Sequence, residues 1–193
     1  MTSRRLAVAR TGPPIGTALL IPLLTPLIAP LLTAPAGSAL ELRGSTFFAR
    51  PPWKADLVSY RTTVGDPRAE YFFSVELDEA AGASLGGLLI RQSEGPERIS
   101  PFSIDRTRAF LGRPRGQGES IPVEADVSGR EVSVRFPQPV PPGSTVTVVL
   151  KPWSNPSVPG TYLFQVTAFP DGPNPNPTPL GSARLRIYRP DWR

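Results

Sequence analysis

The sequence predicts an all-β domain, an antiparallel β-sandwich of the immunoglobulin-like kind with about nine strands, after an N-terminal signal peptide. Short runs that alternate apolar and polar residues recur at regular spacing along residues 40–193. Alternation with period two is typical of half-buried strands, and no helical pattern longer than two turns interrupts it. The chain also has 26 proline and 17 glycine residues, which favour turns and edge positions between such strands.

The clearest alternation lies in residues 141–170, where two runs flank a turn rich in Pro, Asn and Gly. In each run, apolar side chains fall on one face and mostly polar side chains fall on the other. The apolar rows are Val146, Val148 and Leu150 in the first run, and Tyr162, Phe164, Val166 and Ala168 in the second. This segment therefore predicts two half-buried antiparallel strands.

Seven further runs complete the predicted set of strands. They cover residues 42–48, 56–63, 70–77, 87–92, 121–127, 131–136 and 183–188. The apolar row of residues 70–77 is Tyr71, Phe73, Val75 and Leu77. Phe72 interrupts the opposite row, so we expect it to touch another element. Residues 78–85 are the one stretch expected to form a short helical turn, residues 93–120 are expected to be looser, and Trp53 is expected to cover the core.

Residues 1–39 have the layout of a secretory signal peptide. Three arginines and no acid open this segment, an apolar run follows, and small residues precede a cleavage position at Ala39 or Ala36. Prolines interrupt the apolar run and disfavour a permanent bilayer helix, so an uncleaved anchor is the alternative. Residues 40–193 are then a single exported domain with no transmembrane segment, located in the periplasm, the cell envelope or the thylakoid lumen.

Histidine and cysteine are both absent. Their absence excludes Ser-His-Asp and Cys-His catalysis, disulfide bonds, and zinc or copper sites built on imidazole or thiolate groups. The formal net charge is +5, but three of the 21 basic residues lie in residues 1–39, where there is no acid. The remaining 18 basic and 16 acidic residues are interspersed, so no nucleic-acid partner is expected.

A series of ordered motifs resembles a known family. The longest are PPGSTVTVVLKP at residues 141–152, GTYLF at residues 160–164 and VTAFP at residues 166–170. Shorter matches lie at residues 81–85, 109–112, 155–156, 180–181 and 185–188. Together they resemble the cyanobacterial family called domain of unknown function 2808, over most of residues 42–190. The resemblance implies an exported cyanobacterial protein with no assigned activity, and it supplies no catalytic residues.

A second likeness concerns Gly160, Thr161 and Tyr162. This run is similar to the penultimate strand of immunoglobulin-like domains, where a tyrosine caps a corner. Small periplasmic copper-binding sandwiches share such a strand. Because they bind copper largely through histidines, their function is not transferred to this chain.

An arginine-rich section is the first candidate for surface recognition. Six arginines between residues 91 and 115 could hold an anionic partner through bidentate hydrogen bonds. The alternative is a solvated face in which the arginines pair with Glu94, Glu97 and Asp105. The predicted recognition residues of this section are Arg106, Arg108, Arg113 and Arg115.

Three aromatic residues are the second candidate. Trp153 lies in a predicted turn, so we expect it to be exposed, where it could stack on a sugar ring or anchor a partner. The alternative for Trp53, Trp153 and Tyr162 is packing in the core or at a corner.

Two acidic patterns support weaker hypotheses. The oxygens of residues 171–177 suit calcium, but their spacing is not that of an EF-hand, and the prolines favour a stiff extended loop. Glu70 and Glu76 share one predicted strand face, about 20 Å apart at roughly 3.3 Å per residue. A glycosidase needs its two carboxylates roughly 5–10 Å apart. No catalytic residue, metal ligand or cofactor is therefore assigned.

These observations favour an exported, non-enzymatic binding or structural module of the cyanobacterial cell envelope. Its expected partner is an envelope protein or a polysaccharide, recognised by Trp153 and the nearby arginines. The alternative is a carbohydrate- or cation-binding accessory domain. A hydrolase that works with carboxylates alone is the third interpretation.

Overall fold

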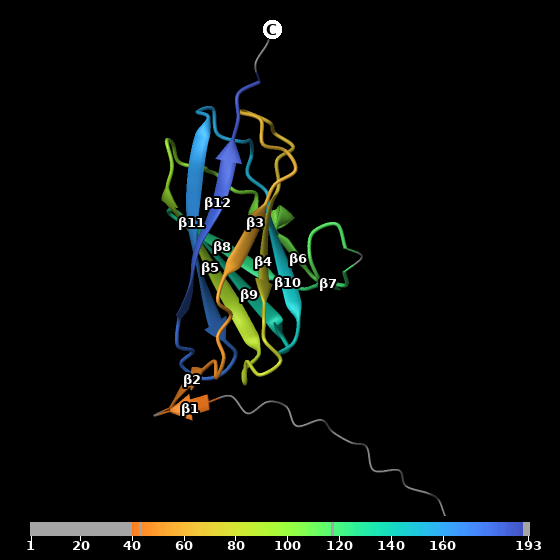
Figure 1. The fold of residues 1–193 in the computed structure, drawn as a ribbon, viewed down its shortest axis with the longest axis vertical. Coiled ribbons are helices and arrows are strands. Elements are labelled where there is room, and N and C mark those ends of the chain that lie inside the picture. Colours follow the sequence, from red (N-terminus) through yellow and green to blue (C-terminus); the bar gives the residue numbers. More distant parts are fainter. Residues whose placement is uncertain (1–39, 43, 117, 191–193) are drawn as a thin grey trace, which may run out of the picture. The chain divides into compact units, whose positions relative to one another are not determined.

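A computed structural model describes residues 40–42, 44–116 and 118–190, and shows an all-β architecture (Figure 1). Two antiparallel sheets of five strands face each other, and a separate two-stranded hairpin precedes them. This arrangement confirms the predicted antiparallel, immunoglobulin-like β-sandwich. Its described residues form twelve strands where the sequence predicts about nine, together with one 3-10 turn. The predicted signal peptide, residues 1–39, lies outside the described residues.

The first sheet has the strand order β3-β4-β10-β6-β7. Its strands are β3 (Ala55–Val58), β4 (Tyr71–Glu76), β10 (Thr145–Leu150), β6 (Arg108–Leu111) and β7 (Ser120–Ile121). The second sheet has the order β12-β11-β5-β9-β8. Its strands are β12 (Thr178–Ile187), β11 (Gly160–Pro170), β5 (Leu85–Glu94), β9 (Glu131–Val140) and β8 (Glu124–Ser128).

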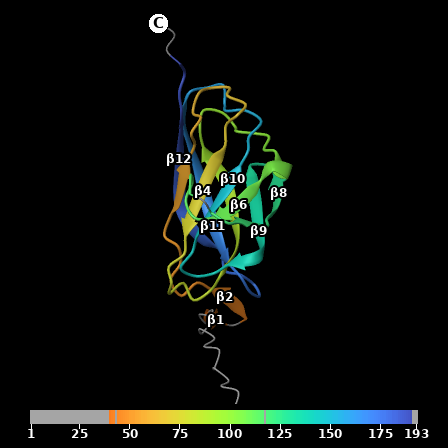
Figure 2. The ribbon, with the colours of Figure 1, turned by 90° about the vertical axis from the view of Figure 1, so that its right-hand side faces the viewer.

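The two strands of residues 141–170 belong to different sheets. β10 pairs with β4 and β6, whereas β11 pairs with β12 and β5. The turn between them therefore carries the chain from one layer of the sandwich to the other. Figure 2 shows the two layers from the side, with β12 at one lateral edge and β8 at the other.

Three local predictions differ from the structure. Residues 42–48 are not one strand, because Gly44 has a φ of +78° and reverses the chain between β1 (Leu40–Leu42) and β2 (Ser45–Phe47). Residues 93–120, expected to be loose, contain β6 and β7.

The helical turn predicted for residues 78–85 is wrong. There, Asp78 accepts a hydrogen bond from the Ala80 amide through its carboxylate (2.7 Å) and from the Ala81 amide through its carbonyl (2.9 Å), which closes a reverse turn. The described chain has its helical turn at η1 (Ile104–Arg106) instead, within residues 93–120, which were expected to be loose.

An aromatic cluster joins the two sheets in the core. Tyr71 and Phe73 of β4 point at Phe164 of β11, with ring centroids 6.2 and 5.4 Å apart in edge-to-face contacts. All three side chains are at most 1% exposed. The inward rows predicted for residues 70–77 and 161–168 are therefore confirmed, and edge-to-face packing adds to the hydrophobic stabilisation they provide.

Tyr162 closes a corner before β11. Its side chain is fully buried, and its hydroxyl donates a hydrogen bond to the carbonyl of Val158, 2.6 Å away and four residues upstream. This geometry confirms the resemblance of the strand to the tyrosine corner of immunoglobulin-like domains. Trp53, in contrast, does not cover the core, because it is 78% exposed.

The buried tyrosines predict a loss of stability in alkali. Burial raises the pKa of Tyr162 from 10.0 to about 12, and the charge of Glu97 adds to the shift. Burial also raises the pKa of Tyr71. Because the folded-state pKa exceeds the unfolded one, this stabilising contribution is complete below pH 10 and is lost as the pH rises towards 12. We expect the urea midpoint to fall over this range.

The Tyr162→Phe variant tests the source of the alkaline loss. It removes the titrating group, so its midpoint should be lower at neutral pH but should fall less steeply between pH 10 and 12. Tyr188→Phe, which alters an exposed tyrosine, is the matched control and should follow the unsubstituted protein. Parallel curves for Tyr162→Phe and the unsubstituted protein would contradict the assignment.

Candidate functional site

Trp153 projects from the turn that follows β10. A short antiparallel bridge holds this turn: Trp153 donates its backbone N–H to Pro101 (3.1 Å), and Ser103 donates to Lys151 (2.8 Å). The backbone that leads into the tryptophan is thus fixed, while its side chain is 68% exposed. The expectation that Trp153 lies exposed in a turn is confirmed.

A cleft of about 580 Å³ lies beside Trp153. Phe102 lines it with an apolar ring, and Arg106 and Lys151 line it with positive charge. Lys151 is held in place, because its ammonium group donates hydrogen bonds to the carbonyls of Ala69 (2.9 Å) and Pro67. Arg106, on η1, makes no ion pair within the described residues. The cleft combines an exposed indole with two cationic groups and one acidic residue, Asp105.

The structure brings two of the five predicted recognition residues together, Trp153 and Arg106. The other three arginines lie on the outer face of the first sheet, where each has an acidic or aromatic partner. Arg108 contacts both carboxylate oxygens of Glu70, at 2.8 and 3.1 Å. The role of these three arginines in recognition stays a prediction.

Arg113 and Arg115 fasten the segment after β6 to this face. Arg113 bridges Asp56 of β3 (3.3 Å) and Glu76 of β4 (2.7 Å). Arg115 lies 3.9 Å from the centre of the Tyr60 ring. The alternative in which these arginines pair with Glu94, Glu97 and Asp105 is wrong in its choice of partners. The chain folds back across the sheet, so the arginines meet residues that are distant in sequence.

A buried hydroxyl pair lies under the same segment. The Thr147 hydroxyl donates to the Gly112 carbonyl (2.6 Å), so it accepts from the Ser74 hydroxyl at 2.8 Å. Phe72, which interrupts the polar row of its strand, packs against Tyr60 with ring centroids 5.4 Å apart. The outer face of this sheet is therefore a packed polar and aromatic layer.

The aromatic candidates do not gather in one place. Trp53 lines a different hollow, next to Glu76 and Asp78, and Lys54 lies 4.7 Å from the centre of its ring. Tyr162 is buried at its corner. Within the described chain, Trp153 is the sole tryptophan of the cleft beside Arg106.

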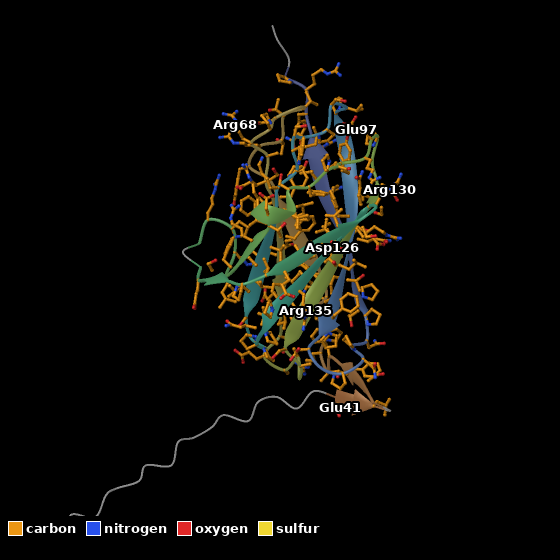
Figure 3. The ribbon with its side chains drawn as sticks, turned by 180° about the vertical axis from the view of Figure 1, so that it is seen from behind. Glu41, Arg68, Glu97, Asp126, Arg130 and Arg135 are labelled. Atoms are coloured by element: carbon orange, nitrogen blue, oxygen red, sulfur yellow. The ribbon has the colours of Figure 1, made fainter. Side chains whose placement is uncertain are left out.

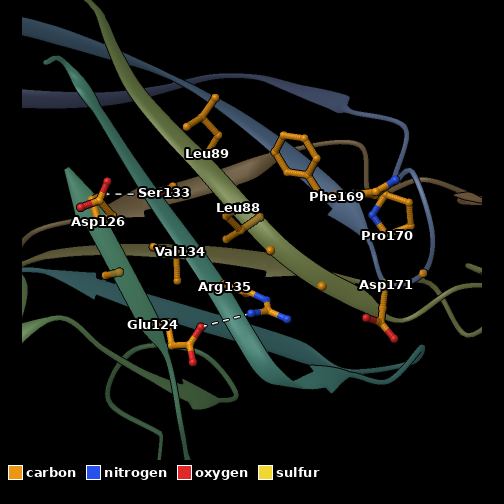
Figure 4. A pocket seen from close by; sticks show the side chains of 15 residues that line it. Leu88, Leu89, Glu124, Asp126, Ser133, Val134, Arg135, Phe169, Pro170 and Asp171 are labelled. Carbon is orange, nitrogen blue, oxygen red and sulfur yellow. Dashed lines mark hydrogen bonds and ion pairs between the residues drawn. The ribbon is translucent and has the colours of Figure 1, made fainter. Parts of the chain in front are cut away.

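Sequence reasoning missed a groove of about 530 Å³ on the outer face of the second sheet (Figure 4). Leu89 and Phe169 give it apolar surface, and Gly87 keeps its floor low. A Cβ atom at Gly87 would lie 2.8 Å from the Val134 carbonyl, so the close approach of β5 and β9 requires a glycine. The pair of glycines at the start of β5 is the one sequence signal that could have indicated it.

Acidic side chains line the rim of this groove. Glu124 accepts a hydrogen bond from Arg135 at 3.4 Å (Figure 4). Asp126 and Asp171 also line the groove and make no ion pair within the described residues.

The loop of residues 171–177 is attached to the N-terminal hairpin. Asn174 donates its side-chain amide to Gly44 (3.0 Å), and Asn176 donates its backbone N–H to Thr46 (2.9 Å). Within the described chain, no three acidic residues gather as they would around a metal ion. No helix of the described chain is long and apolar enough to cross a membrane.

Comparisons with known proteins give a family match and distant likenesses. A family model described as "Protein of unknown function (DUF2808)" matches residues 45–187. No curated protein matches the chain. Similar solved structures include a DUF4466 family protein from Parabacteroides merdae, the collagen-binding domain of a Staphylococcus aureus adhesin, and BcpA, the major pilin subunit of Bacillus cereus.

These structural likenesses are weak. In the same order, the identities are 11%, 7% and 8%, and the TM-scores are 0.44, 0.40 and 0.41. The matches cover 72%, 72% and 70% of this chain, and 45%, 100% and 39% of the other chains. This chain thus spans less than half the length of the Parabacteroides protein and of the pilin subunit. Likenesses this distant carry no argument about the function of this chain.

Proposed function

The chain belongs to the DUF2808 family, as its motifs indicate, and from this premise we propose that it is an exported, non-enzymatic binding module of the cyanobacterial cell envelope. The family has no assigned activity, so the proposal rests on a site. That site is the cleft beside Trp153, Arg106 and Lys151. In this role the protein recognises an envelope protein or a polysaccharide through its surface.

The single observation that carries the proposal is the exposure of Trp153 on a fixed backbone. A large aromatic side chain that is 68% exposed leaves apolar surface in contact with water, which a partner can remove. Tryptophan and arginine are also the residues that most often dominate binding interfaces. Because the bridge between residues 101–103 and 151–153 fixes the turn, little backbone entropy is lost on binding.

A carbohydrate-binding accessory domain is the second candidate. The indole ring of Trp153 can stack on a sugar ring, and Arg106 can bind a carboxylate or sulfate of an acidic polysaccharide. A hydrolase that uses carboxylates alone has less support, since Glu70 and Glu76 each bind an arginine.

Crosslinking in cells tests the proposal. The tagged mature protein is crosslinked, and its neighbours are identified by mass spectrometry across envelope fractions. We expect Trp153→Ala to lower the recovery of the partner at least about tenfold, in keeping with the loss of an anchor residue. Trp53→Ala is the matched control, because Trp53 is also exposed but lines a different hollow.

The outcomes separate the two candidates. A reproducible protein partner that depends on Trp153 supports the binding module, and recovery only with wall or polysaccharide material supports the carbohydrate-binding domain. Equal losses for the two tryptophan variants, or none for either, would overturn the role of the cleft.

A further inference from the structure

The two lateral sides of the sandwich differ in how their edge strands are covered. On one side, β3 of the first sheet lies alongside β12 of the second (Figure 1). Tyr188, directly after β12, also donates its N–H to Thr62 (2.8 Å) and accepts from Val64 (2.9 Å). On the other side, β7 is only two residues long. Among the described strands, its contact with β8 is not comparable to that between β3 and β12. β8 is thus the less protected edge.

The backbone of β8 has groups that face outward from the sheet. A two-residue turn joins β8 to β9, with Ser128 opposite Glu131. In such hairpins, hydrogen-bonded and non-hydrogen-bonded pairs alternate from the turn, beginning with a hydrogen-bonded pair at Ser128 and Glu131. Val127 and Ala125 therefore fall in non-hydrogen-bonded pairs, and their N–H and C=O groups point away from β9. Neither residue has a backbone hydrogen bond outside the ladder within the described chain, and η1, which approaches β8, donates none. Free edge groups of this kind are a template for another strand.

The side chains of β8 present two different faces along this edge. The outer row, Glu124, Asp126 and Ser128, is exposed, and the inner row, Ala125 and Val127, is half-buried. Neighbouring apolar residues before the strand, Ile121 and Val123, are also half-buried against the core. The core is therefore only partly covered along this edge, where the backbone groups of β8 also lack partners within the described chain.

Charge distinguishes the outer row. Asp126 lies with Arg135 on the face seen in Figure 3, where the acids of the groove rim outnumber the basic groups. Arg135 is already bonded to Glu124, which leaves Asp126 and Asp171 without a cationic partner within the described residues. A strand added beside β8 would place its outward side chains next to Glu124 and Asp126, with the groove open to long basic side chains.

We propose that β8 binds, by strand addition, an extended segment of another protein in which apolar and basic residues alternate. The apolar residues cover Ala125 and Val127, and the basic residues lie opposite Glu124 and Asp126. Opposite charges in cross-strand positions are stabilising, whereas like charges are destabilising. Two β8 strands from two copies of this chain would place acid opposite acid, so pairing of identical edges is disfavoured. Backbone hydrogen bonds provide affinity in this mode, and side-chain alternation provides specificity.

Synthetic peptides test this proposal on the mature full chain. The probe is a labelled six-residue peptide that alternates Val and Lys, and its binding is measured by fluorescence anisotropy. A peptide of the same composition with three Val followed by three Lys controls for charge alone, and one that alternates Val and Glu controls for the pattern alone. We expect the alternating basic peptide to bind at least about tenfold more tightly than either control, a difference of about 1.4 kcal/mol.

Variants and spectra locate the site. Asp126→Lys should weaken binding of the alternating basic peptide at least tenfold, and Glu41→Lys, the same charge change on the N-terminal hairpin, should not. The amide resonances of Ala125 and Val127 should shift on binding. Val127→Pro, which removes an edge N–H, should lose the binding although circular dichroism shows that the chain still folds.

Four results would overturn the proposal. The peptides could bind equally or not at all, the two lysine variants could weaken binding alike, or the shifts could map to β12. Concentration-dependent self-association of the chain through β8 would also overturn it, because a second copy would then be the occupant. This edge does not include Trp153, so its test and that of the proposed function can fail separately.

Discussion

Replacing Phe164 with alanine is expected to lower the free energy of unfolding by about 3–5 kcal/mol, as for large aromatic residues in a tight core. Phe164 is 1% exposed, and its ring contacts Tyr71 and Phe73 across the two sheets. The variant loses the burial of the ring and leaves a cavity at the contact between the layers. Urea unfolding followed by tryptophan fluorescence and circular dichroism measures the change.

Phe169→Ala is the matched control for this prediction. Phe169 lies on the same strand, but it lines the groove on the outer face and is only half-buried. We expect a loss of about 1 kcal/mol or less, because less apolar surface leaves water at this position on folding. A similar loss for the two variants would show that the inter-sheet cluster does not dominate the core.

The inward faces of the central strands could be predicted from sequence because alternation directly reports which side of a strand is buried. Tyr71, Phe73 and Phe164 were identifiable in this way. The same pattern fails for β10, where Thr147 and Val149 are both fully buried although they face away from the core between the sheets. The segment after β6 covers Thr147, whose hydroxyl bonds to the Gly112 carbonyl. A covering contact between distant segments leaves no local periodic signal.

The candidate site was predictable where local turn chemistry determines exposure. Trp153 lies among proline and asparagine residues that form a turn, so its exposure followed from the sequence. Trp53 also follows two prolines, but it is exposed where core packing was expected. Prolines indicate that strand pairing ends, but they do not indicate whether the next side chain points into the core or into solvent. The arginine partners and the β8 edge depend on the order of strands in the sheets, which composition and alternation do not encode.

Asn155→Ala is expected to destabilise the fold by at least about 3 kcal/mol. Asn155 is 2% exposed and joins three segments. Its side-chain oxygen accepts from the Tyr71 hydroxyl (2.8 Å), and its side-chain N–H groups donate to the carbonyls of Arg61 (2.9 Å) and Thr63 (2.7 Å). Alanine leaves the buried Tyr71 hydroxyl without a partner, which costs roughly 1–3 kcal/mol. It also removes one hydrogen bond, worth roughly 1 kcal/mol, from each of the two carbonyls. These carbonyls still accept from the Ser59 hydroxyl (3.0 Å) and the Asp66 N–H (3.3 Å). The loss is measured by urea unfolding at pH 7.

Tyr71→Phe and the double variant identify the origin of that loss. Tyr71→Phe removes one hydrogen bond of the three and should cost about 1–2 kcal/mol. In the double variant the phenyl ring has no hydroxyl to satisfy, so the combined loss should be smaller than the sum of the single losses. Strictly additive losses would mean that the hydrogen bond between Tyr71 and Asn155 contributes no coupling. The stability of the corner would then come from the two backbone carbonyls, which tie the loop between β3 and β4 to the turn that carries Trp153.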